Sequence, residues 1–104
     1  MKIFIDDDMS ANVPDGFVQE STSRRSIFLI REGRVKAVCF GHGESAFSTA
    51  TWLQGLMNFT TLHKDLQVSA EASRVERRTL RVLNETFGSE QFPMDPPPRL
   101  VKVN

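Results

Sequence analysis

A short stretch near the middle of the chain limits what the protein can fold into. Residues 34–40 read as an apolar strand, Gly41 and Gly43 follow it directly, and residues 45–62 have the pattern of an amphipathic helix. The helix is predicted because apolar residues recur at spacings of three and four, at Ala46, Ala50, Leu53 and Met57. A strand that leads into a helix through a glycine loop predicts a domain with both sheet and helix.

The glycine loop also matches a phosphate-binding motif. Gly41, Gly43 and Ala46 have the G-x-G-x-x-A spacing of dinucleotide-binding loops, in which backbone N–H groups at a helix N-terminus hold phosphate. That motif belongs to a parallel unit in which another strand follows the helix, and no clear strand is visible after residue 60. We therefore predict a structural turn, with Ser45 capping the helix. The alternative is phosphate or nucleotide binding by Gly41, Gly43 and Ser45.

The remaining segments predict a sheet that is antiparallel. Residues 2–5 read as a strand, and residues 26–31 and 34–40 read as the two arms of a β-hairpin that turns at Gly33. The first arm is apolar on both sides, at residues 27–30, which is typical of a central strand. In the second arm, alternation predicts a core face made of Val35, Ala37 and Cys39.

A second helix is predicted from about residue 73, or from Ser69, to a stop at Gly88. The fold class is therefore α+β: a small antiparallel sheet of three to four strands packed against two amphipathic helices, in the order β-β-β-α-α with a possible final β. Residues 1–92 form the single domain of this prediction. Residues 93–104, which contain Pro96, Pro97 and Pro98, form a proline-rich extension that is either an edge strand or a tail.

Catalytic and metal sites find little support. Cys39 and His42 have the spacing of half a zinc site and His63 is a third candidate ligand, but no second pair completes a tetrahedron. The same Cys39 and His42 have no evident acid to orient them as a nucleophile and base. The acidic run Asp6, Asp7 and Asp8 is a weak candidate for a divalent cation. We expect no catalytic residues, no metal and no cofactor, and hence a protein that is not an enzyme.

The strongest functional signal is a group of arginines on the second predicted helix. Arg74, Arg77, Arg78 and Arg81 recur at spacings of three, one and three, opposite the apolar stripe, and two pairs place like charges four residues apart. An anionic partner would relieve this repulsion, and arginine suits bidentate recognition of carboxylates or phosphates. An internal alternative is that the acidic run at residues 6–8 docks against these arginines.

These observations favour a protein-binding function. The chain has a formal net charge of zero and a pI near 6.7, with no Tyr and a single Trp, whereas nucleic-acid binders are usually basic. We expect a small cytoplasmic regulator or inhibitor, of the kind phages encode, that covers or bridges an acidic surface of a larger protein through the four arginines. A nucleic-acid-binding accessory protein is the alternative. Trp52 and the strand 27–30 predict a homodimer, and no apolar run is long enough to cross a membrane.

Overall fold

The computed structural model describes residues 1–57, 65–88 and 91–92 of the 104-residue chain. Predictions that concern His63, the end of the helix at residue 62, and the extension at residues 93–104 lie outside these residues. Within the described residues, seven elements follow one another: β1 (Lys2–Ile5), β2 (Val18–Glu20), α1 (Ser23–Arg31), β3 (Ala37–Phe40), α2 (Glu44–Met57), β4 (Gln67–Ala70) and α3 (Arg77–Phe87).

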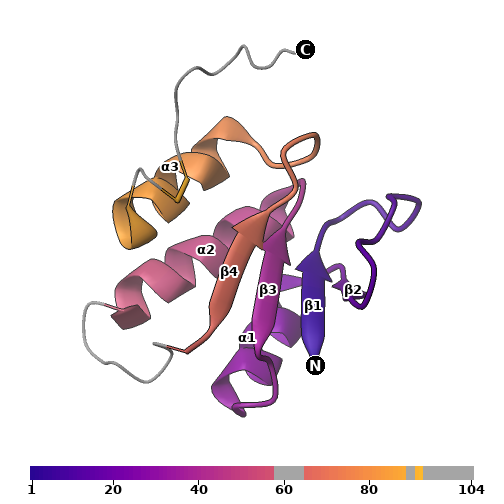
Figure 1. The fold of residues 1–104 in the computed structure, drawn as a ribbon, viewed down its shortest axis with the longest axis horizontal. Coiled ribbons are helices and arrows are strands. Elements are labelled where there is room, and N and C mark those ends of the chain that lie inside the picture. The colour runs from indigo at the N-terminus through magenta and orange to yellow at the C-terminus, as the bar shows by residue number, and fades with distance from the viewer. Residues whose placement is uncertain (58–64, 89–90, 93–104) are drawn as a thin grey trace.

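The four strands form one sheet in the order β2-β1-β3-β4, and every neighbouring pair is parallel (Figure 1). The central pair aligns Ile3 with Val38 and Ile5 with Phe40. The prediction of an antiparallel sheet is therefore wrong. Parallel strands need long crossover connections, and helices supply two of them: α1 connects β2 to β3 across the intervening β1, and α2 connects the neighbours β3 and β4.

The predicted β-hairpin is replaced by a helix and a strand. Residues 23–31 form α1, with the Thr22 hydroxyl accepting a hydrogen bond from the backbone N–H of Arg25 as its N-cap. Its buried residues, Ser26, Leu29 and Ile30, follow helical spacing rather than the alternation of a strand. Gly33 has a φ of 73° just beyond the helix and ends it, so this glycine closes a helix and not a hairpin.

The sequence prediction also missed β4, which separates α2 from α3. This edge strand buries Val68 and exposes Gln67 and Ser69, so it carries little of the apolar pattern that marks a strand. The prediction that no strand follows the glycine loop and its helix is therefore wrong, and β3, α2 and β4 form a parallel βαβ unit. The second predicted helix begins later, at Arg77, and ends at Gly88 as predicted.

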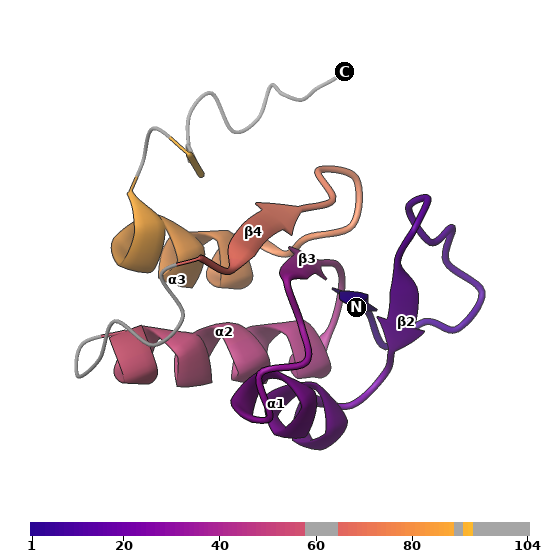
Figure 2. The same cartoon turned by 60° about the horizontal axis from the view of Figure 1, so that its bottom comes forward.

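All three helices lie on one side of the sheet or at its edge. Both helical crossovers advance in the same direction across the strand order, so the right-handed rule places α1 and α2 on the same face, as Figure 2 shows. The third helix packs against α2 beside β4. The principal core joins Val38 and Phe40 to residues of the helices, whereas Ala37 and Cys39 are buried outside that cluster, which corrects the predicted core face of β3.

Candidate functional site

Two regions of this fold gather charged side chains. The first lies at the carboxyl ends of β1 and β3, and we call it the carboxyl-edge cluster: Asp6, Asp7, Asp8, Arg74 and the loop 41–45. The chain leaves β1 toward β2 on one side of the sheet, and the following strands lie on the other side. In open parallel sheets, ligands bind outside the carboxyl ends of the strands at such a reversal of strand order. The position is therefore the first place to look for a site.

Asp6 is the centre of this cluster and is 0% exposed. Its carboxylate accepts hydrogen bonds from Nε and Nη2 of Arg74, both at 3.0 Å, and from the backbone N–H groups of His42 and Asp8, both at 2.9 Å. Burial by itself would raise the pKa of Asp6, but the guanidinium and the two N–H groups outweigh it and hold the pKa below its usual value. Asp6 is thus a fully satisfied buried carboxylate.

Asp7 fills the position that a bound anion would take at the start of α2. Its two carboxylate oxygens accept hydrogen bonds from the backbone N–H groups of Glu44, at 2.9 Å, and Ser45, at 3.2 Å. An aspartate from the loop after β1 therefore caps α2 and complements the positive end of its dipole. The predicted cap at Ser45 is not formed: the Ser45 hydroxyl is buried without a hydrogen-bond partner among the described residues.

The two loop glycines make room for these carboxylates. A Cβ at Gly41 would collide with the carboxylate of Asp6 and the ring of Phe4, and a Cβ at Gly43 would collide with the carboxylate of Asp7. Gly43 also has a φ of 104°, which side chains rarely allow. The loop therefore does cradle anions, but they belong to the protein itself, and a phosphate at Gly41, Gly43 and Ser45 would have to displace Asp7.

The four predicted arginines divide between the two regions. Arg74 lies in a turn before α3 rather than on the helix, and it contacts Asp6 as well as Asp8, whose carboxylate lies 3.5 Å from Nη2. The internal alternative, docking of the acidic run, is thus realised for this arginine. The pKa of Asp8 is lowered by hydrogen bonds from Ser10, with a smaller contribution from Arg74.

The other three arginines form the second region, which we call the arginine surface: Arg77, Arg78 and Arg81, all exposed on α3. Arg78 is held by Glu76 at 3.1 Å and Glu44 at 3.2 Å, and its guanidinium lies 4.4 Å from the ring centre of Phe47. Neither Arg77 nor Arg81 has an acidic partner within ion-pair distance in the described part of the chain.

The arginine surface lies at the N-terminal end of α3, where positive charge is unfavourable for helix stability. The N-terminus of a helix carries partial positive charge, so acidic residues in the first turn stabilise it and basic residues destabilise it. The first turn of α3 contains no acidic residue and begins with Arg77 and Arg78. Arg77 and Arg81 also repel each other at a spacing of four. The N-cap of α3 is acidic, but Glu76 makes no capping hydrogen bond and its carboxylate pairs with Arg78, so Arg77 and Arg81 have no ion pair of their own among the described residues.

The Cys39 and His42 candidates do not assemble into a site. Cys39 is buried in β3, where burial raises the pKa of its thiol, and His42 is exposed with Nδ1 3.7 Å from a Glu76 oxygen. Among residues 1–57, 65–88 and 91–92, no group of three or more His, Cys, Asp or Glu side chains is arranged to hold a metal ion. None of the helices in that part of the chain has the length and apolar character that a membrane crossing requires.

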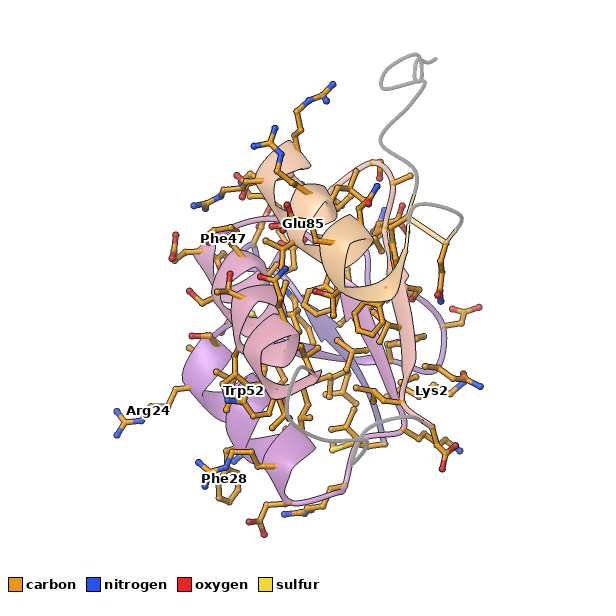
Figure 3. All side chains as sticks on the ribbon, turned by 90° about the vertical axis from the view of Figure 1, so that its left-hand side faces the viewer. Lys2, Arg24, Phe28, Phe47, Trp52 and Glu85 are labelled. Carbon is orange, nitrogen blue, oxygen red and sulfur yellow. The ribbon has the colours of Figure 1, made fainter. Side chains whose placement is uncertain are left out.

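Sequence reasoning missed a surface on the two other helices. Arg24, Phe28 and Arg31 are exposed on α1, where a strand was predicted, and Phe28 is 48% exposed. Beside α1, the exposed or half-exposed residues of α2 are uncharged from Ser45 onward. Figure 3 shows Arg24, Phe28, Trp52 and Phe47 on the helical side of the molecule, away from Lys2. The run without Asp, Glu, Lys or Arg from residue 45 to 63 was the available signal.

Comparisons with protein-family models, with curated proteins and with solved structures find no match to this chain.

Proposed function

We propose that this protein is a non-enzymatic binding protein that acts on a larger protein partner by covering or bridging an acidic surface of it. The arginine surface makes the contact, and the protein acts as a regulator or an inhibitor. The observation that carries this proposal is the placement of three arginines within the first five residues of α3, two of them without an acidic partner among the described residues. Charges that oppose the helix dipole are explained if a bound partner supplies the carboxylates.

The hydrogen bonds already made within the carboxyl-edge cluster support the same proposal. The backbone N–H groups of the glycine loop and the Arg74 guanidinium already have carboxylate partners, at distances of 2.9 to 3.2 Å for Asp7 and 3.0 Å for Asp6. A small anionic ligand there would compete with groups held at very high local concentration. Arg77 and Arg81 face no such competitor among the described residues, so we favour a binding surface over a phosphate pocket.

The test is capture of a partner from a lysate of the source cell with a pair of charge-reversed variants. Arg77→Glu with Arg81→Glu removes the two arginines that have no internal ion pair, whereas changing Arg78 would also break its contacts with Glu44, Glu76 and Phe47. Arg34→Glu with Lys36→Glu is the matched control, because these exposed residues carry the same charge. They precede β3, at the amino-terminal ends of the strands, whereas α3 begins beyond the carboxyl ends.

We expect the wild type and the control to retain one discrete protein that the α3 variant loses by about a hundredfold, an effect of two charge-assisted contacts. Nuclease treatment before capture should leave this result unchanged. Equal recovery by the wild type and the folded α3 variant would refute the arginine surface, and recovery that disappears with nuclease would favour the nucleic-acid alternative.

A further inference from the structure

The outer face of α2 lacks charge although it is on the surface. The exposed residues Thr51 and Gly55 and the half-exposed residues Phe47, Ser48 and Trp52 make up this face, which we call the α2 face. Surface helices normally expose a charged stripe, and helices without one are usually covered by another element. Within the described part of the chain, α1 and α3 flank α2. On this face Trp52 is half-exposed and also packs against the core, and the ring of Phe47 lies beneath Arg78.

Arginines lie on both sides of the α2 face, and on the α3 side they are accompanied by Glu44, which accepts a hydrogen bond from Ser48, and Glu85, which accepts one from Gln54. On one side, Arg24 and Arg31 of α1 are exposed and have no acidic partner among the described residues, and Phe28 lies between them on the same helix face at spacings of four and three. On the other side, Arg78 stacks over Phe47 and brings the charges of α3 next to α2. Together the three helices carry six arginines and two glutamates, whereas the whole chain is neutral.

We propose that the α2 face and its bordering arginines bind an acidic amphipathic segment of the partner, whose apolar side chains lie on Phe28, Trp52 and Phe47 and whose carboxylates meet the arginines of α1 and α3. This inference rests on the proposed function and extends the arginine surface across the helical side of the molecule. An uncharged centre bordered by arginines without ion pairs, on α1 and on α3, is complementary to an apolar stripe with acidic borders, which an amphipathic helix presents.

The same charge pattern argues against the other occupants. A second copy that placed the same face against this one would bring arginines of α1 and α3 close to arginines of its twin, and like charges across an interface cost affinity. Nucleic acid would satisfy the arginines and an unpaired base would stack on Phe28, but the chain as a whole is neutral, whereas nucleic-acid binders are usually basic. An acidic amphipathic segment satisfies both the charged border and the exposed ring.

The probe for this inference is a synthetic helical peptide that contains glutamate and leucine, with leucine at spacings of three and four, and a scrambled peptide of identical composition. Neither contains tryptophan, so the fluorescence of Trp52, the single tryptophan of the chain, reports directly on the α2 face. We expect the amphipathic peptide to bind about tenfold more tightly than the scrambled one and to shift the Trp52 emission to shorter wavelength, because apolar burial adds to the charge attraction.

Two variants localise the effect. Phe28→Ala should weaken the amphipathic peptide by about tenfold, as expected for an aromatic anchor near the centre of an interface. Val18→Ala should have no effect, since Val18 is a similarly exposed apolar residue, at 51%, on the edge strand β2. Arg24→Glu with Arg31→Glu should weaken both peptides.

Failure of this inference is distinct from failure of the proposed function. Equal binding of the two peptides, with loss only in Arg77→Glu with Arg81→Glu, would refute the α2 face and leave the arginine surface intact. Absence of binding by either peptide would also refute the α2 face, while partner capture would judge the arginine surface separately. A dimer in sedimentation that Phe28→Ala dissociates would assign the face to a second copy and overturn the proposal.

Discussion

The N-termini of α2 and α3 are a matched pair with opposite chemistry. At the start of α2, the backbone N–H groups of Glu44 and Ser45 donate to the carboxylate of Asp7, and the adjacent Asp6 is buried against Arg74. At the start of α3, the first two residues are arginines, and the acidic N-cap residue Glu76 pairs with Arg78 and makes no capping hydrogen bond. Carboxylates therefore cap the first helix end, whereas arginines in the first turn oppose the helix dipole at the second. This contrast supports our proposal that the carboxyl-edge cluster serves the fold and that the arginine surface binds a partner.

The largest effect on stability is expected in the carboxyl-edge cluster. Asp6→Ala leaves the Arg74 guanidinium and two backbone N–H groups without their partner, and should lower the free energy of unfolding by about 3 kcal/mol. The control is Asp15→Ala, which removes an exposed carboxylate from the loop between β1 and β2 and should change stability by less than about 0.5 kcal/mol. Urea unfolding measures both variants. Equal stability of the two would mean that Asp6 does not hold the cluster together.

A smaller loss is expected when the glycine loop is filled. Gly43→Ala combines an unfavourable φ with a collision against Asp7, and should cost about 2 kcal/mol. Gly33→Ala is the matched control: this glycine has a φ of 73° but nothing within 4 Å of an added Cβ, so it should cost about 1 kcal/mol from the backbone alone. The difference in melting temperature should be the same with and without phosphate. A nucleotide that stabilised the wild type and not Gly43→Ala would support the alternative of phosphate binding at this loop.

The carboxyl-edge cluster also determines how the free energy of unfolding changes at low pH. The pKa values of Asp6 and Asp8 are lowered in the folded protein, so their contribution to stability is fully present above the pKa of an unfolded aspartate, about 4. That contribution should be lost as the pH falls below about 4 and passes through the lowered values. Asp6→Asn should flatten this part of the stability curve measured by urea unfolding between pH 7 and 2. A wild-type curve that is already flat there would contradict the ion pair between Asp6 and Arg74.

The sequence predicted local features of this comparison but not the contacts that create it. Short-range patterns predicted the glycine loop, the strand at residues 2–5, the end of a helix at Gly88 and the arginines on one face of α3. The docking of Asp6 onto Arg74 joins residues 68 positions apart, so no local pattern could select it over a solvated acidic run. The two alternatives were visible, and only the tertiary structure chose between them.

The error in fold class has a similar physical origin. Residues 27–30 are four consecutive apolar residues, and a short apolar run does not distinguish a strand from a buried helix segment. The N-cap residue Thr22 and the helical spacing of Ser26, Leu29 and Ile30 were the local signs of α1 in the sequence. The edge strand β4 buries only Val68 in full, so its pattern was too weak to reveal the parallel βαβ unit. Once both were missed, an antiparallel sheet was the consistent but wrong conclusion.

The central claim is that the arginines of α3 are kept for binding and at the expense of stability. The most direct test is urea unfolding of Arg77→Glu with Arg81→Glu, alone and with the acidic amphipathic peptide in excess. A glutamate at position 77 suits the first turn of α3, whereas one at position 81 would repel Glu85 four residues further on, so the stability of the variant alone should lie within about 1 kcal/mol of the wild type. The peptide should raise the unfolding midpoint of the wild type and leave that of the variant unchanged. A variant that is less stable than the wild type by more than about 1 kcal/mol, and that the peptide stabilises equally, would show that these arginines support the fold and do not bind the partner.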